Sequence, residues 1–341
     1  MTDLKSPKMM DHPFPKSISV RKKLKQLQQA VSPGDTLGIV IDADPDSMAS
    51  ALALRRLLWR KVSHVLIYHV NRIKRTDNLA FTSLLKVEQK HIRYMKRATI
   101  NRWAIVDSQP QHREEFGGIP FDIVIDHHPA LPTSRAPFVD IREKYGATST
   151  MMTEYLRAAR IVPSGRLATA LFCGIKTDTD NFIRECLPGD LNSFRYLHAF
   201  VNMNIIKKIE SSEITKKTLS KFRLAMERLT FLDDIAYVHM ERVDNPDILV
   251  ILADFFLKLA EANWSIVSGV YDAKLIVVIR NATFRGDAGN VAQKLFGPWG
   301  GSAGGHVSAA RAEIPLSKIR SQVNDSSGLA HRVRRQLKLL M

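Results

Sequence analysis

Cysteine is scarce in this chain: Cys173 and Cys186 are the only two among 341 residues. Two cysteines cannot build a disulfide framework or a zinc site made of thiolates. Both lie in or near segments with the composition of buried helix, so we expect them to be reduced residues of a cytoplasmic protein.

Long apolar runs are also missing. The most apolar stretch, residues 248–259, is interrupted by Asp254 and Lys258 and is too short to cross a bilayer. Residues 1–15 contain Lys5 and Lys8 but no apolar core of a signal peptide. These absences predict a soluble protein without a membrane partner.

Acidic residues are few relative to basic ones. The chain has 34 Asp and Glu against 50 Lys and Arg, which gives a formal net charge of +16 and a pI near 9.9. A single basic cluster is more simply explained as a solvated helix face. The whole surplus, however, predicts a polyanionic partner, most simply nucleic acid.

Up to about residue 180 the hydrophobic pattern alternates between strand-like and helix-like segments. The candidate strands are residues 37–41, 64–70, 103–106 and 121–125, the candidate helices are residues 48–59, 78–90 and 147–159, and a last apolar run covers residues 167–176. Such alternation is typical of a parallel sheet covered by helices on both faces. We therefore predict an α/β fold.

The remaining segments predict a basic helix before this domain and a second, smaller α/β domain after it. Residues 19–31 and the tail through Leu329, Val333 and Leu337 have the pattern of basic amphipathic helices, and residues 191–229 that of a helical connector. In the second domain, residues 235–240, 264–270 and 275–280 are candidate strands, and residues 248–261 and 290–295 are candidate helices. We divide the chain into residues 1–33, 34–189, 190–232, 233–315 and 316–341.

Acidic residues and histidines follow the apolar runs of the first domain. Asp126-His127-His128 comes directly after residues 121–125, Asp107 after residues 103–106, and Asp178 after residues 171–176. Asp42, Asp44 and Asp46 follow residues 39–41 in the same way. Since an open parallel sheet carries its chemistry at the carboxyl ends of its strands, these groups are expected to form one site for divalent cations. The pattern predicts a metal-dependent phosphoesterase.

Simpler explanations exist for each group alone. An EF-hand calcium loop is excluded for residues 42–53, because Ser47 replaces the required Gly and Ala53 the required Glu. Single aspartates after strands are often helix caps. Their recurrence in order with the paired histidines favours one common site.

The order of these motifs resembles that of a known family. Asp-Ala-Asp-Pro-Asp-Ser from residue 42, Asp107, Asp126-His127-His128 and Gly-Ile-Lys-Thr-Asp-Thr from residue 174 resemble the four motifs of the DHH phosphoesterase superfamily. The segment from Gly304 to Ala310 resembles the glycine-rich signature of the DHH-associated C-terminal domain. The resemblance covers roughly residues 36–315 and is strongest to RecJ-like exonucleases and the nanoRNase and pAp-phosphatase group.

This resemblance implies two divalent cations, Mn²⁺ in preference to Mg²⁺. Asp107 would bridge them, Asp46, His127 and Asp178 would complete one site, and Asp44 would hold the other. His128 would contact the scissile phosphate, so that His128 and Asp107 are the expected catalytic residues. The expected substrate-binding residues are Arg280, Gly304, Gly305 and His306.

Two positions depart from the family pattern. Val40 stands where many members have a histidine, which should weaken the second metal site; Asp42 is the candidate replacement. Arg311 stands where glycine is usual, and would alter the pocket edge or add a phosphate contact.

The leading expectation is hydrolysis of phosphodiester bonds in short or single-stranded nucleic acid. Other substrates stay open: 3′-phosphoadenosine 5′-phosphate (pAp), cyclic dinucleotides and polyphosphate. A protein of another class, which binds single-stranded DNA without cutting it, is the second alternative. A homodimer is also compatible with the sequence.

Overall fold

A computed structural model describes residues 19–131, 136–184, 186–211, 214, 216–319 and 326–338. The first 18 residues of the expected N-terminal segment lie outside these ranges. The chain forms two compact units, which are described separately. Unit 1 comprises residues up to Ile73 and Asp77–Glu210, and unit 2 comprises Lys74–Thr76 and the residues from Ser211 onward.

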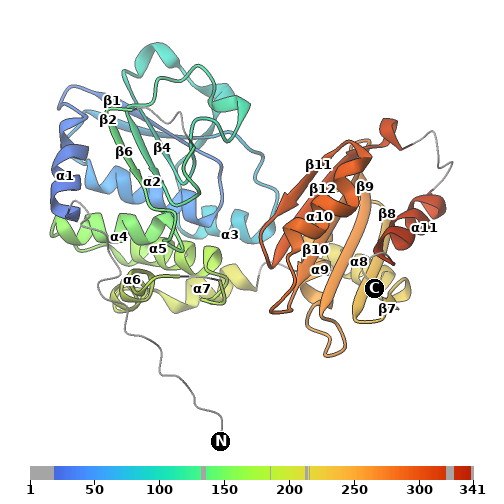
Figure 1. Cartoon of the computed structure of the whole chain (residues 1–341). Coiled ribbons are helices and arrows are strands. Elements are labelled where there is room, and N and C mark those ends of the chain that lie inside the picture. Colours follow the sequence, from blue (N-terminus) through green and yellow to red (C-terminus); the bar gives the residue numbers. More distant parts are fainter. Residues whose placement is uncertain are drawn as a thin grey trace, which may run out of the picture. The chain divides into compact units, whose positions relative to one another are not determined.

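A six-stranded parallel sheet forms the centre of unit 1 (Figure 1). Its strands are β1 (Thr36–Ile41), β2 (His64–His69), β3 (Lys90–His91), β4 (Arg102–Val106), β5 (Ile123–Asp126) and β6 (Phe138–Ile141). The spatial order is β3-β2-β1-β4-β5-β6, so the chain reverses its direction of travel across the sheet between β1 and β4. Such a reversal opens a crevice at the carboxyl ends of the two strands.

The α-helices of unit 1 bury their apolar residues on one face of this sheet. They are α1 (Val20–Gln29), α2 (Pro45–Leu57), α3 (Thr76–Leu84), α4 (Thr148–Ala158), α5 (Gly165–Asp178), α6 (Pro188–His198) and α7 (Met203–Glu210). Leu37, Ile39 and Ile41 alternate along β1 toward this layer, where α2, α4 and α5 pack against one another (Figure 1). The expected parallel sheet flanked by helices is confirmed.

The opposite face of the sheet has a different cover. Val40, Trp103 and Ile105 point to this side and pack against apolar residues of short 3₁₀ turns and loops. The turns span Ile92–Tyr94, Arg97–Thr99 and Glu114–Phe116. Helices were expected on both faces, but within the described residues the α-helices supply only one of the two layers.

Unit 1 differs locally from the sequence-based expectations at three places. Asp178 was grouped with the acidic residues at strand ends, but residues 171–176 belong to α5, whose last residue is Asp178. Ser164 caps that helix by accepting a hydrogen bond from the Leu167 N–H. Periodicity alone cannot tell whether a short apolar run is a buried strand or part of a buried helix. Helix α3 ends at Leu84 instead of continuing to residue 90, and β6 was not foreseen.

Unit 2 contains a mixed six-stranded sheet in the order β11-β12-β10-β9-β8-β7. The strands are β7 (Thr230–Leu232), β8 (Ile235–Arg242), β9 (Trp264–Tyr271), β10 (Lys274–Asn281), β11 (Ser302–Gly305) and β12 (Ala309–Pro315). Only β8 and β9 are parallel neighbours among these described strands. The glycine-rich stretch, which gave no strand signal, contributes β11 at the edge.

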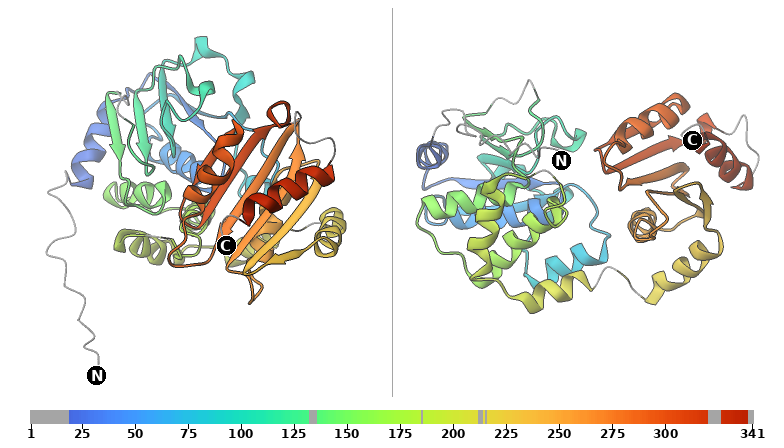
Figure 2. Two further views of the ribbon diagram at one scale, coloured as in Figure 1. Left: turned by 45° about the vertical axis from the view of Figure 1, so that its right-hand side comes forward. Right: turned by 60° about the horizontal axis from the view of Figure 1, so that its bottom comes forward.

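Helices cover both faces of this second sheet, as the right-hand view of Figure 2 shows. Helices α8 (Lys216–Glu227) and α9 (Asp247–Phe256) pack on one face, α10 (Ala288–Phe296) and α11 (Ser326–Leu337) on the other. Leu329, Val333 and Leu337 of α11 are buried, as their spacing predicted. Within the described residues, no helix combines the length and apolar character needed to cross a membrane.

Candidate metal centre

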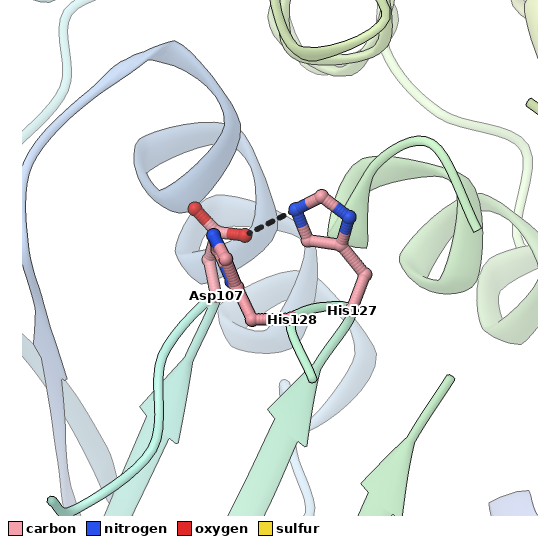
Figure 3. Close-up of side chains that lie close together, drawn as sticks. All are labelled: Asp107, His127 and His128. Atoms are coloured by element: carbon pink, nitrogen blue, oxygen red, sulfur yellow. Dashed lines mark ion pairs between the residues drawn. The ribbon is translucent and has the colours of Figure 1, made fainter. Parts of the chain in front are cut away.

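Four side chains from four elements meet at the carboxyl end of the unit 1 sheet. They are Asp46 in the first turn of α2, Asp107 directly after β4, His127 directly after β5 and Asp178 at the end of α5. One donor atom of each lies within 4.8 Å of the donor atoms of the others. Figure 3 shows Asp107 and His127 facing each other beyond the ends of two neighbouring strands. We call these four residues the acidic cluster.

Asp107 is positioned by an unusual backbone turn. Its N–H still donates to the Ile125 carbonyl at 2.8 Å, which continues the β4–β5 pairing, but its φ of 61° lies in the left-handed region. Aspartate tolerates this conformation better than most residues. The side chain accepts a hydrogen bond from Thr148 Oγ1 at 2.9 Å. Burial raises the pKa of Asp107 well above its usual range, and the negative charges of Asp46 and of the other nearby aspartates raise it further.

Asp46 joins α2 to the start of α4. Its two carboxylate oxygens accept hydrogen bonds from the backbone N–H groups of Thr148 and Ser149, each at 2.7 Å. Ala147 precedes α4 and offers no side-chain cap, so Asp46 supplies the negative charge that the helix N-terminus favours. Burial and then the charge of Asp178 outweigh these hydrogen bonds and raise the pKa of Asp46 to about 6.

His127 presents one ring nitrogen to the acidic cluster. Its Nδ1 lies 3.0 Å from the Tyr145 carbonyl, which can only accept, so Nδ1 carries the proton. Nε2 is buried 3.1 Å from Asp178 Oδ2 and 3.5 Å from Asp107 Oδ1, and it is not aligned for a hydrogen bond. Burial lowers the pKa of His127, but Asp178 and Asp46 raise it more, to about 9. The carboxylates thus favour a positive charge at this point.

A glycine permits the close packing around Asp46. A Cβ atom at Gly174 of α5 would lie 2.4 Å from Ser149 Oγ and 2.9 Å from Asp46 Oδ1. Helix α5 can therefore approach α2 and α4 here only without a side chain. The same approach places Asp178, one turn further along α5, beside His127.

These donors fit a divalent cation. Three carboxylates and one imidazole suit Mn²⁺ and Mg²⁺, with the nitrogen ligand favouring Mn²⁺. Carboxylates with raised pKa values and a buried nitrogen without an aligned hydrogen bond are stabilised when a cation replaces their protons. The fixed Nδ1–H tautomer of His127 leaves Nε2 as the ligand atom.

The other predicted ligands are placed differently. Asp44 caps α2, accepting from the Ser47 N–H at 2.8 Å, and burial followed by the charge of Asp46 raises its pKa to about 6. It therefore borders the acidic cluster. Asp42 instead forms an ion pair with Arg113. Val40 is fully buried within the apolar layer under the 3₁₀ turns.

His128 belongs to a second hydrogen-bonded group beside the acidic cluster. Its Nδ1 lies 2.8 Å from Asp126 Oδ1, while Gln109 Nε2 donates to Asp126 Oδ2 at 2.7 Å. Burial would raise the pKa of Asp126, but the hydrogen bonds from His128 and Gln109 hold it below its usual value. The ring of His112 contacts His128 edge-on with centroids 5.6 Å apart. Asp126 orients His128 and leaves its Nε2 for another partner.

Several residues of this centre had no signal in the sequence. Thr148 and Ser149 donate hydrogen bonds to Asp46 and Asp107, and the Tyr145 carbonyl accepts from His127. Gln109 donates to Asp126, which holds His128, and the His112 ring contacts the His128 ring. The only hint was a short run of small polar residues at the start of a predicted helix.

In unit 2, the predicted substrate-binding residues lie near one end of the sheet. Arg280 of β10 pairs in register with Ala309 of β12, and the His306 N–H donates to the Ala309 carbonyl at 2.8 Å. Arg280 Nε donates to Asp254 Oδ1 at 2.5 Å, so its charge is already paired. Gly304 of β11 lies opposite Arg311 of β12.

Glycines shape this end of the unit 2 sheet. Gly305 has a φ of 154°. A Cβ atom at Gly289 of α10 would lie 2.5 Å from the carbonyl oxygen of Gly305. The Gly289 N–H donates to the His306 carbonyl at 3.0 Å. The β11–β12 turn and the start of α10 are thus held in backbone contact.

Comparisons with known proteins agree with this architecture. Residues 36–175 match the DHH family, N-terminal domain. An uncharacterized protein of Methanocaldococcus jannaschii is 32% identical over 290 residues, which cover 85% of this chain and 59% of that protein. The chain therefore spans about three fifths of the length of this relative. A second uncharacterized protein of the same organism is 24% identical over 314 residues, covering 82% of this chain and 87% of its own.

A solved structure shares the fold over nearly the whole chain. The crystal structure of an exopolyphosphatase-related protein from Bacteroides fragilis superposes with a TM-score of 0.74 and 14% identity, covering 95% of this chain and 98% of its own. At this identity the likeness concerns the fold alone. Residues 36–175, which include the parallel sheet and the motifs with Asp46, Asp107 and His127, therefore form a domain of the DHH family.

Proposed function

We propose that this chain is a metal-dependent phosphoesterase that hydrolyses phosphodiester bonds of short or single-stranded nucleic acid and releases nucleoside monophosphates. The observation that carries this proposal is the acidic cluster, in which Asp46, Asp107 and Asp178 converge with the buried Nε2 of His127. Repelling carboxylates in such a place are stabilised by cations.

The residues divide the work as follows. Asp46, Asp107, His127 and Asp178 would hold one cation, and Asp107 together with Asp44 would hold the second. When bound, two Mn²⁺ or Mg²⁺ ions supply an activated water and offset the charge of the phosphoryl oxygens. His128, oriented by Asp126, would donate from Nε2 to a phosphate oxygen as negative charge develops there.

Recognition of the substrate is assigned to two features. Arg280, Gly304, Gly305 and His306 of unit 2 are proposed to grip the terminal nucleotide. The +16 net charge favours a substrate with several phosphates over a single nucleotide. Hydrolysis of pAp, cyclic dinucleotides or polyphosphate is the alternative within the same chemistry, and binding of single-stranded DNA without cleavage is the alternative of another class.

The test is the release of mononucleotides from a labelled short oligonucleotide by the full chain with Mn²⁺. Parallel reactions contain DNA or RNA, pAp, a cyclic dinucleotide or polyphosphate, each with a chelator control. We expect Mn²⁺-dependent cleavage of the oligonucleotides at a higher kcat/KM than any other substrate. Faster release of phosphate from pAp or polyphosphate would replace the proposed substrate. Oligonucleotide binding without any hydrolysis would favour the non-catalytic alternative.

A further inference from the structure

A basic surface lies at the amino end of the unit 1 sheet, away from the acidic cluster. Two hollows of about 460 and 450 Å³ adjoin there and share Arg56 and Trp59 in their walls. Helix α2 begins beside Asp46 and ends at these hollows, and α5 runs in the reverse direction from the hollows to Asp178. The 13 residues of α2 span about 20 Å, so this surface is remote from the site already described.

Positive charge dominates the walls of the two hollows. Among the described residues, the cationic lining residues are Arg21, Lys25, Arg55, Arg56, Arg60, Lys61 and Arg166, whereas Glu88 is the one carboxylate. Glu88 lies 3.4 Å from Arg55. In the described part of the chain, no carboxylate comes within ion-pair distance of Arg56, Arg60, Lys61 or Arg166. We call this set of cations together with Trp59 the amino-end surface.

Trp59 is an exposed aromatic ring in the middle of these charges. Its side chain is 62% exposed, and the guanidinium groups of Arg56 and Arg60 lie 5.0 and 5.6 Å from the ring centre. The surrounding turn is fixed, because the Lys61 N–H donates to the Leu58 carbonyl at 2.8 Å and Arg60 takes a left-handed φ of 63°. The ring and its neighbouring cations are therefore presented by an ordered turn.

Charges flanking an exposed aromatic ring are what single-stranded nucleic acid requires: the cations contact phosphates, and a base stacks on the ring. The cations belong to α1, to the end of α2 and the turn that follows it, and to the start of α5, so they are spread over a surface and do not converge on one point. Such a spread suits a row of phosphates better than a single phosphate group. We propose that the amino-end surface binds a nucleic acid single strand, with a base against Trp59.

This binding does not depend on hydrolysis at the acidic cluster, so the two proposals can fail separately. Equilibrium binding of a fluorescently labelled oligothymidylate is measured with the full chain in the presence of a chelator. The oligonucleotide is longer than the roughly 4–16 nucleotides that common single-strand-binding folds cover. The variant Arg60→Glu/Lys61→Glu reverses two exposed charges of the amino-end surface. The control variant Lys96→Glu/Arg97→Glu reverses two exposed charges at the 3₁₀ turns, which cover the sheet face opposite to the α-helices.

We expect the Arg60→Glu/Lys61→Glu variant to lose at least about tenfold in affinity at low salt, and its log–log salt slope to fall by roughly 1.4, or 0.7 for each lost phosphate contact. The control variant should stay within about threefold of wild type. Equal losses in both variants, or none in the first, would overturn the proposal. Thermal unfolding of both variants verifies that the fold is intact.

Trp59 gives an independent readout. Oligothymidylate should quench tryptophan emission of the wild type, and Trp59→Phe should remove most of this quenching, because stacking brings a base onto the ring. Quenching that persists in Trp59→Phe would contradict the assignment. Equally tight binding of a mononucleotide would also contradict the proposal and would indicate a pocket for a small ligand. A change of oligomeric state in Arg60→Glu/Lys61→Glu with unchanged oligonucleotide binding would contradict it as well and would indicate contact with a second copy of the chain.

Discussion

The two ends of the α2–α5 pair in unit 1 differ in both charge and accessibility. At the carboxyl end of the sheet, Asp46 and Asp107 are buried and their pKa values are raised. At the amino end, Arg60, Lys61 and Trp59 are exposed to solvent. Buried like charges create a strong demand for a few counterions, whereas exposed charges interact weakly one by one and act only through many contacts. One end is therefore suited to metal ions, and the other to a polyanion.

Helix α2 connects these two environments and supports both. Its N-terminus carries Asp44 as cap and Asp46 in the first turn, while Arg55 and Arg56 lie in its last turn. Acidic groups at the start and basic groups at the end both interact favourably with the helix dipole. The separation of charge along α2 is thus compatible with a stable helix as well as with two different binding surfaces.

The largest effect is expected from Asp107→Asn, which removes the carboxylate that is proposed to serve both cations. Asparagine tolerates the left-handed backbone of this position, whereas alanine would add strain. Oligonucleotide hydrolysis should fall by more than about a hundredfold, or roughly 2.7 kcal/mol in barrier height. Steady-state rates at saturating Mn²⁺ measure this, with circular dichroism as the check on folding. Activity within about tenfold of wild type would contradict the bridging role of Asp107.

A smaller loss is expected from Thr148→Val, which removes the hydroxyl that donates to Asp107 but keeps the shape of the buried side chain. Residues that support metal ligands typically affect metal affinity or activity by about 10–100-fold. The Mn²⁺ concentration for half-maximal rate should rise by about tenfold. Thr153→Val is the matched control, because Thr153 is also buried in α4 but donates only to the Ser149 carbonyl. Equal behaviour of the two variants would assign the effect to helix stability.

The pH dependence of stability should distinguish the buried carboxylates from the exposed basic end. The pKa of Asp46 is raised from 3.8 to about 6, so the folded protein binds its proton more tightly than the unfolded chain does. Stability from this group is therefore present at low pH and is lost as pH rises from about 4 to about 6, by a few kcal/mol.

Denaturant unfolding in a chelator, from pH 4 to pH 7, compares wild type with Asp46→Asn. As pH rises, the wild type should lose unfolding free energy relative to Asp46→Asn, because Asp46 must release its proton and asparagine does not titrate. A difference that is independent of pH would mean that Asp46 is not a strained carboxylate.

The smallest effect expected is on salt dependence. If several phosphates contact the basic surplus, KM for a long oligonucleotide should rise steeply with salt, with a log–log slope of roughly 0.7 per contacted phosphate. KM for a dinucleotide should change much less. Steady-state assays at two or three salt concentrations are sufficient. Equal, shallow salt dependence of both substrates would leave the positive charge without a role in substrate capture.

The sequence predicted the parallel sheet and the residues of the acidic cluster because both leave a local signal. Strand periodicity gave β1, β4 and β5, and the aspartates and histidines followed them directly. The structure brings Asp46, Asp107, His127 and Asp178 together, and their role as metal ligands stays a prediction. Residues 171–176 include Cys173 and have the composition of buried helix; they belong to α5, so Asp178 reaches the acidic cluster from the end of a helix and not from the end of a strand.

Other features depend on tertiary contacts that no local pattern encodes. Tyr145 contributes only a carbonyl group, and Thr148 only a hydroxyl that is common in any helix. The pairing of Asp42 with Arg113 joins residues far apart in the chain. The amino-end surface likewise combines side chains from α1, α2, the turn after α2 and α5. The basic clusters of the sequence gave no indication that they surround Trp59.

Titration of Mn²⁺ into the metal-free full chain, followed by calorimetry, tests the role of the acidic cluster most directly. The wild type and Arg60→Glu/Lys61→Glu should bind two ions per chain with similar affinities, because the amino-end surface takes no part in metal binding. Asp107→Asn should lose most of this binding, since its carboxylate is expected to serve both ions. Saturable Mn²⁺ binding that is unchanged in Asp107→Asn, or the absence of binding to the wild type, would contradict the assignment of a catalytic metal centre to the carboxyl end of this sheet.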